Sequence, residues 1–345
     1  VPSETREHTT RGRITGSRLP KQGINETEII YVSDMAENMY AFSRLDGAFQ
    51  RTKSLLWPIR WGVWLRLALI ALFVGGGVSF PNTSGYTFDE GDLPAGVVES
   101  LPDIAPLIVA FILIVLAIAL IWWIIGTVMQ FVFVDMLRTG DIHIRRFFGE
   151  RLGKGVRLFL FEAALTLILI LAMMAFILML VGLGGSGGGG VAFILLFIPF
   201  ILVAALLFGL IFLLTHDFVV PMMIHEDCGV IEGWRRLIGV ISANVWQTVV
   251  YVVTRFVVGL IAGIVQAVLV ILAMLIIAIP FVLIGVVLLA AALANYVLLL
   301  VLLIPYLVVA VPVALLIAVP FVTFFRYYGL LVLEGLAPGY RLLPE

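Results

Sequence analysis

The sequence predicts an all-α fold, a polytopic bundle of transmembrane helices. Hydrophobic residues make up 62% of the 345-residue chain and charged residues only 12%, about half the charged share of a soluble domain. The run from Phe256 to Phe325 contains no Asp, Glu, Lys, Arg or His. At about 1.5 Å per helical residue, this run is long enough to cross a bilayer core of roughly 30 Å about three times. We therefore expect lipid to surround most of the chain.

The two ends of the chain differ in composition. Residues 1–38 are polar and of mixed charge, which predicts a disordered N-terminal tail, and residues 39–345 are expected to form a single membrane domain. The chain begins with Val1 rather than Met. One hypothesis is that the start is misassigned and that translation begins at Met35 or Met39.

Apolar stretches separated by polar connectors predict the spans. Six are expected, near residues 61–80, 104–134, 156–183, 191–216, 247–279 and 305–333. The glycine-rich run 184–190 predicts a turn, because glycine disfavours a helix by about 1 kcal/mol per residue. The stretch 281–304 lies between Pro280 and Pro305 and is also apolar. It is a re-entrant segment, an extension of a long hairpin, or additional spans, so six spans are preferred and eight remain an alternative.

The distribution of basic residues predicts the orientation. They gather before the first span and between the second and third, whereas the loop at 81–103 is acidic and has no Lys or Arg. Because basic loops stay on the cytoplasmic side, an even number of spans places both termini in the cytoplasm. The expected location is the cell (plasma) membrane.

Three connectors share a pattern. Residues 47–56, 140–148 and 229–238 each begin with glycine and have a basic residue six positions later, followed by apolar residues. In the third connector, Val230, Trp234, Leu237 and Ile241 fall on one stripe of a helix. The pattern predicts amphipathic elbow helices lying in the membrane interface, each followed by two spans, as a pseudo-threefold repeat. The alternative is that ordinary basic connectors resemble one another by chance.

Polar residues near or within the spans are the candidate functional positions, because charge in lipid is costly. They are Arg66, Glu162, Arg255, Asn295, His225, Glu226, Asp227 and Arg235. Snorkelling or a structural ion pair is the simpler explanation for the first three, and a transport role is the alternative. His216 and Asp217 join the cluster at 225–227, which a water-exposed loop end also explains. Gln130 and Gln266 are neutral polar sites, and Arg326 is interpreted as an anchor of the last span.

The sequence gives no positive case for catalysis. It has no nucleophile elbow, phosphate-binding loop or standard metal motif, so no catalytic, cofactor-binding or metal-binding residue is assigned and no enzyme is expected. A net charge of −1 argues against a nucleic-acid partner. Gly259 and Gly263 form a small-xxx-small pattern that predicts close helix packing.

Three stretches, at residues 55–77, 217–236 and 320–334, resemble an uncharacterised family of multi-pass membrane proteins from salt-loving archaea. More distantly, the connector around Pro221 is similar to the membrane domain attached to some glycerophosphoryl diester phosphodiesterases. The chain lacks the soluble barrel and the His/Glu/Asp site of those enzymes. The resemblance therefore implies a membrane module and not the enzyme's catalysis.

The leading hypothesis is a non-enzymatic membrane module that binds membrane lipids or other membrane proteins, without a cofactor. The alternatives are a small-solute transporter or channel and a lipid-modifying enzyme. A transporter needs a polar path at mid-membrane, for which Gln266 and Asn295 are the candidates.

Overall fold

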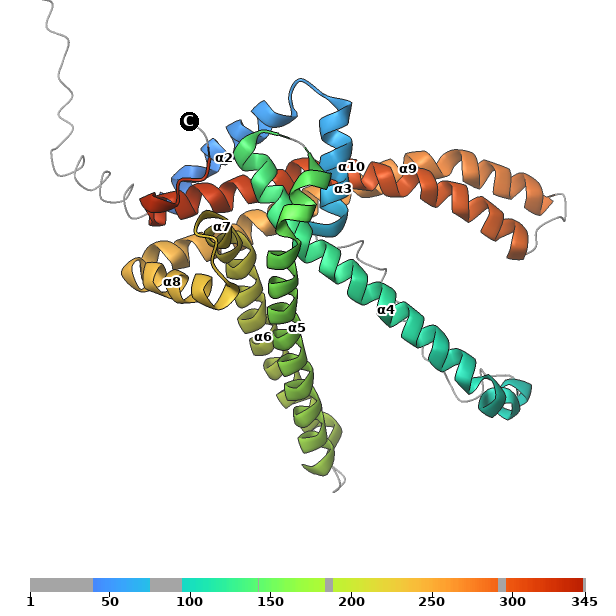
Figure 1. Cartoon of the computed structure of the whole chain (residues 1–345). Helices are drawn as coiled ribbons and strands as arrows, with labels where there is room; N and C mark the ends of the chain where they lie inside the picture. Colours follow the sequence, from blue (N-terminus) through green and yellow to red (C-terminus); the bar gives the residue numbers. More distant parts are fainter. Residues whose placement is uncertain (1–39, 75–94, 142, 184–188, 291–295, 344–345) are drawn as a thin grey trace, which may run out of the picture. The chain divides into compact units, whose positions relative to one another are not determined.

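The computed structural model describes residues 40–74, 95–141, 143–183, 189–290 and 296–343 (Figure 1). Contacts divide the chain into Val1–Asn38 and a compact unit at Met39–Glu345. The predicted tail at 1–38 therefore lies outside the described residues. Within them every element is a helix: α2 (Tyr40–Leu56), α3 (Trp61–Val74), α4 (Ala95–Thr139), α5 (Ile144–Leu183), α6 (Gly189–Leu214), η1 (Thr215–Val219), α7 (Val220–His225), α8 (Val230–Ala243), α9 (Val245–Ala290), α10 (Tyr296–Leu336) and η2 (Pro338–Tyr340).

Five of the described helices are long and apolar enough to cross a membrane, which suggests a membrane protein. Their apolar segments are Ala105–Thr139, Ile144–Leu180, Leu195–His225, Val245–Leu289 and Val301–Leu336. The first expected span corresponds to α3, an apolar helix of 14 residues. At about 1.5 Å per residue it is about 21 Å long, less than a bilayer core. Its expected continuation to residue 80 lies outside the described residues, so the count of six remains a prediction.

The structure differs from the sequence expectation at Pro280. We expected the fifth span to end there, but α9 continues through this proline to Ala290, and α10 begins at Tyr296 and continues through Pro305. Proline is tolerated inside membrane helices because neighbouring helices and local adjustments satisfy the backbone groups that it frees. In the described residues, the stretch 281–304 therefore forms the facing ends of two helices that pack against each other.

The elbow helices are observed only in part. α2 and α8 are separate helices that precede α3 and α9. The second connector is different, because its residues from Ile144 onward are the first turns of α5 and continue into the span without a break. The pseudo-threefold repeat is therefore not confirmed.

Helix α8 buries the stripe predicted from its sequence, but against protein. Val230 and Leu237 are buried, and the ring of Trp234 lies 6.5 Å from that of Phe161 on α5. Gly233 allows the close approach of η1, since a Cβ there would lie only 2.8 Å from Val219 Cγ1. The stripe thus fixes α8 to its neighbours.

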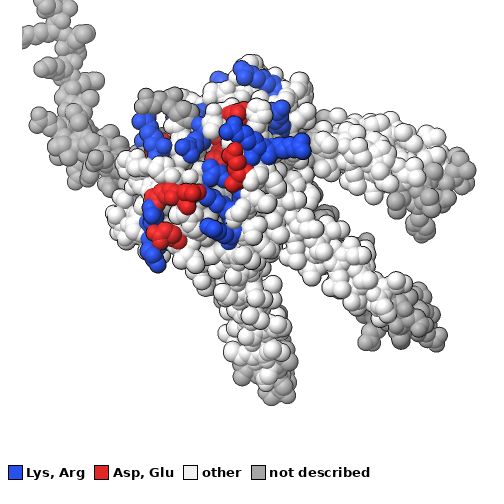
Figure 2. All heavy atoms as spheres, in the orientation of Figure 1, with Lys and Arg blue, Asp and Glu red and all other residues white. Residues whose placement is uncertain are grey.

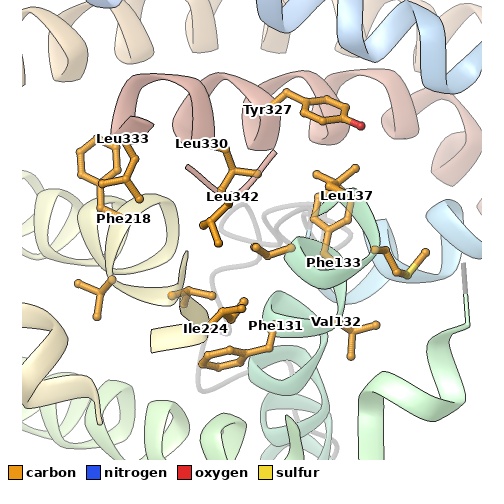
Figure 3. Packing of buried hydrophobic residues seen from close by; sticks show 14 of the residues in the cluster. Phe131, Val132, Phe133, Leu137, Phe218, Ile224, Tyr327, Leu330, Leu333 and Leu342 are labelled. Carbon is orange, nitrogen blue, oxygen red and sulfur yellow. The ribbon is translucent and has the colours of Figure 1, made fainter. Parts of the chain in front are cut away.

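The core lies where α4, η1, α7 and α10 meet (Figure 3). Phe131 and Phe133 of α4, Phe218 of η1 and Leu333 of α10 are almost fully buried in it. Leu342, beyond η2, also packs there. The core therefore holds the polar ends of several spans together.

The apolar lengths of the spans have a different environment. Leu107 and Phe111 on α4 are 71% and 67% exposed, and Phe256 on α9 is 71% exposed. Figure 2 shows charged side chains gathered over one region of the visible face, while the visible apolar lengths of α4 and α9 carry none. Such surfaces fit a lipid environment, because water would oppose their exposure.

Candidate functional site

A π-helical turn, η1, carries two of the polar residues at the centre of the site. Pro221 has no N–H to donate to the carbonyl of Asp217 four residues earlier, and its ring crowds that carbonyl. The backbone N–H of Val220 bonds instead to the carbonyl of Thr215, five residues earlier. Such π turns are rare and occur frequently at functional sites. The turn places His216 and Asp217 among α4, α5, α9 and α10.

Asp217 forms a buried network with α9. The hydroxyl of Tyr251 donates a hydrogen bond of 2.6 Å to Asp217 Oδ2, and Arg255 Nε donates one of 3.2 Å to the same oxygen. Tyr251 and Arg255 are four residues apart, which places them on one face of α9. Gly329 of α10 permits this packing, because a Cβ there would lie 3.2 Å from Asp217 Cβ. The expectation that Arg255 forms a structural ion pair agrees with this geometry.

Arg326 of α10 is a second buried guanidinium and is 5% exposed. Its Nη1 donates to the carbonyl of His216 at 2.7 Å, and its Nη2 donates to Gln130 Oε1. Both acceptors are neutral, and within the described residues Arg326 forms no ion pair. The sequence interpretation of Arg326 as a span anchor missed this internal role.

Glu162 of α5 is 3% exposed and accepts hydrogen bonds at both oxygens. His216 Nε2 lies 2.8 Å from Glu162 Oε1, and the indole Nε1 of Trp123 donates to Oε2 at 2.9 Å. These bonds join η1 and α4 to α5. Glu162 is thus held inside the protein rather than reaching toward the membrane surface.

A cavity of about 360 Å³ lies beside these groups. One part of its wall is polar and comprises Gln130, His216, Asp217, Arg255, Gln266 and Arg326. Another part is apolar and comprises Val74, Phe133, Leu213, Phe321, Val322 and Phe325. The cavity follows α9 from Arg255 to Gln266, about 16 Å of helix at 1.5 Å per residue.

Small residues of α9 provide the space. Gly259, Ala262 and Gly263 line the cavity, and no neighbouring atom lies within 4 Å of a Cβ built on either glycine. The sequence predicted close helix packing at this small-xxx-small pattern, and the structure shows none at these two glycines. Because residues three and four apart share a helix face, the same pattern leaves an open strip along α9.

Two other candidates are not part of this cavity. Arg66 lines a separate hollow of about 540 Å³, together with His143, Ile144, Arg145 and Arg146. Asn295 lies outside the described residues. The mid-membrane path proposed around Asn295 therefore stays a prediction.

The cluster at 225–227 is dispersed into separate contacts. The His225 ring lies 5.4 Å from that of Tyr340, and Glu226 contacts the hydroxyl of Tyr340. Lys154 Nζ lies 2.5 Å from Asp227 Oδ1, and this neighbour lowers the pKa of Asp227 below its ordinary value of 3.8.

Other residues of this connector also engage their own neighbours. Glu226 forms an ion pair with Arg236, and Arg235 pairs with Glu232 on the exposed face of α8. Burial raises the pKa of the Cys228 thiol. No group of three or more His, Cys, Asp or Glu residues suited to a metal ion is present in the described ranges.

The sequence offered partial signals for the central network. Arg255 was identified as a candidate, but Tyr251 was not, and Asp217 was weighed only as part of a loop end. Two signals point to Tyr251 and Asp217. Tyr251 and Arg255 are four residues apart and share a helix face, and Pro221 lies four residues after Asp217. These signals were insufficient because Asp217 lies on η1 and its partners lie on α9, and only tertiary packing brings these elements together.

Comparisons with known proteins give one match. A model described as a family of unknown function (DUF7544) matches residues 39–343. No curated protein and no solved structure matches. The match agrees with the expected uncharacterised family, whereas the resemblance to proteins of salt-loving archaea and to the phosphodiesterase membrane domain stays a prediction.

Proposed function

Since the chain belongs to DUF7544, a family of unknown function, we propose its role from its geometry: a non-enzymatic, multi-pass membrane module that binds a lipid in the cavity beside η1. In this proposal the protein resides in the cell membrane with both termini in the cytoplasm. The polar ends of the spans then face the inner leaflet.

The amphipathic wall of the cavity is the observation that carries this proposal. Its polar part has groups that suit a lipid head, and its apolar part, including Phe321 and Val322, suits the start of an acyl chain. A volume of about 360 Å³ falls in the range of small-molecule sites, which are mostly apolar with a few convergent polar groups.

The partners of the connector residues support a role without catalysis. A lipid-modifying enzyme needs an acid and a base that face one substrate. Among the candidate polar positions, His225, Glu226 and Asp227 could serve in this way, and they contact Tyr340, Arg236 and Lys154.

Gln266 supports a second candidate, a small-solute transporter. It extends the polar wall of the cavity along α9, and polar groups at this depth frequently mark a solute path. The test is solute uptake into proteoliposomes, with Gln266→Leu as the variant. Uptake that depends on Gln266 favours transport, and the absence of uptake for a panel of ions and small metabolites counts against it.

Site-specific photo-crosslinking tests lipid binding. A photoreactive residue is placed at Val322, which lines the cavity, or at Leu206 of α6, which is 71% exposed. Each full-length protein is washed extensively with detergent, irradiated and analysed by mass spectrometry. We expect Val322 to capture a lipid that survives washing, whereas Leu206 loses its lipids.

Equal loss of lipid at both positions would contradict the proposal. Capture of a protein rather than a lipid at Val322 would also contradict it, and would support the other part of the leading hypothesis, a membrane-protein partner. The Leu206 variant is the matched control, because it reports lipids that merely surround the spans.

A further inference from the structure

The cavity wall has an excess of positive charge. Two guanidinium groups line it, those of Arg255 and Arg326, but only one carboxylate, that of Asp217. Asp217 is engaged by Arg255 through a 3.2 Å hydrogen bond. Arg326 is therefore the cation beside the cavity that lacks a carboxylate partner within the described residues.

The neighbouring carboxylate of Glu162 does not pair with Arg326. Glu162 is absent from the lining of the cavity, and its two oxygens accept from His216 and Trp123. Because Asp217 is paired with Arg255 and Glu162 bonds to other groups, no carboxylate forms an ion pair with Arg326 within the described residues. A buried charge without a counter-charge is costly, most of all in a membrane protein, and an anion in the cavity would neutralise it.

From this balance we infer that the cavity receives the anionic head group of a phospholipid, with Arg326 as the residue that recognises its phosphate. This inference rests on the proposed function, since it names the class of lipid. The planar guanidinium matches the oxygens of a phosphate, and its five N–H groups exceed the two acceptors described for Arg326.

The surroundings favour a lipid over a free phosphate ion as the source of the anion. Phe321 and Val322 continue the wall on α10 next to Arg326, and the open strip at Gly259 and Gly263 continues it on α9. A small hydrated ion would leave this apolar space unfilled, whereas an acyl chain would occupy it.

Native mass spectrometry of the full-length protein tests the inference. The detergent-purified protein is incubated with an anionic phosphatidylglycerol or a zwitterionic phosphatidylcholine of identical acyl chains. We expect at least about tenfold greater retention of the anionic lipid, which corresponds to a difference in binding free energy of about 1.4 kcal/mol. Arg326→Gln is expected to abolish the preference.

A steric variant tests the location. Gly259→Leu fills the cavity without removing a charge and is expected to lower retention of the anionic lipid. Gly209→Leu on α6 is the matched control, because its Cβ also meets no atom within 4 Å and Gly209 is not a cavity residue. Equal effects of the two leucines would place the lipid elsewhere and overturn the assignment.

The possible failures are distinguishable. Equal retention of both lipids by the unsubstituted protein overturns the inference while lipid binding stands, and this comparison needs no variant to fold. Retention of neither lipid overturns the proposed function, and titration with inorganic phosphate then decides the anion site. If inorganic phosphate raises the melting temperature, the anion site stands and its ligand is a soluble anion. If phosphate causes no rise, the anion site is overturned as well.

Discussion

The contact of α4 and α5 at Gly155 gives a quantitative prediction. A Cβ at Gly155 would lie 2.3 Å from Val128 Cγ2 and 2.8 Å from Val128 Cα, well inside ordinary van der Waals distance. The second atom belongs to the backbone, so a side-chain rotation does not relieve the overlap. Gly155→Ala therefore requires the two helices to separate.

The magnitude follows from a matched variant on the same helix. At Gly153 no atom lies within 4 Å of an added Cβ. Both alanines gain the same helix propensity, about 1 kcal/mol, so their difference isolates the cost of overpacking. Overpacking costs about 1–3 kcal/mol in well-packed interiors. Gly155→Ala should be less stable than Gly153→Ala by this amount.

Thermal unfolding of the detergent-solubilised protein, followed by circular dichroism, measures this difference. We expect Gly155→Ala to melt below Gly153→Ala, and Gly153→Ala to melt at or above the unsubstituted chain. Equal melting temperatures for the two alanine variants would refute the close approach of α4 and α5.

Two further predictions concern charged groups. Asp217→Asn leaves the guanidinium of Arg255 buried without its counter-charge. Because breaking a buried ion pair costs about 3–5 kcal/mol, we expect a large fall in thermal stability. A loss of stability below about 1 kcal/mol would contradict this ion pair. The pKa of Asp227 is lowered by Lys154, so this pair stabilises the fold above the ordinary pKa of 3.8, and the stabilisation is lost as the pH falls through the lowered value. Asp227→Asn is a suitable variant because asparagine tolerates the left-handed backbone at φ 54°. It should lower the melting temperature at pH 6 but not at a pH below the lowered pKa of Asp227. A difference in melting temperature that does not change with pH would exclude the ion pair as its cause.

The membrane helices were predictable because hydropathy is a local property. The apolar segments Leu195–His225 and Val301–Leu336 follow directly from composition. The boundary at Pro280 was not predictable in this way, because tolerance of a proline depends on the helix beside it. Here α9 and α10 pack against each other, and the helix continues to Ala290.

The candidate site was predictable only in its individual members. Arg255 is conspicuous in an apolar span, but its partner Asp217 lies 38 residues earlier, and Arg326 contacts the carbonyl of His216 from 110 residues away. Distances of this kind depend on tertiary packing. The glycines of α9 show the same difficulty, since Gly259 and Gly263 fit both a packing motif and a cavity wall by sequence alone.

The central claim is that a lipid occupies the cavity with its head group on Arg326. The most direct measurement is an electron cryomicroscopy map of the full-length protein in nanodiscs that contain an anionic phospholipid. We predict head-group density within hydrogen-bond distance of the Arg326 guanidinium, continuing as a chain along Phe321 and Val322. A well-resolved cavity that holds only water, or that is closed by side chains, would contradict the account.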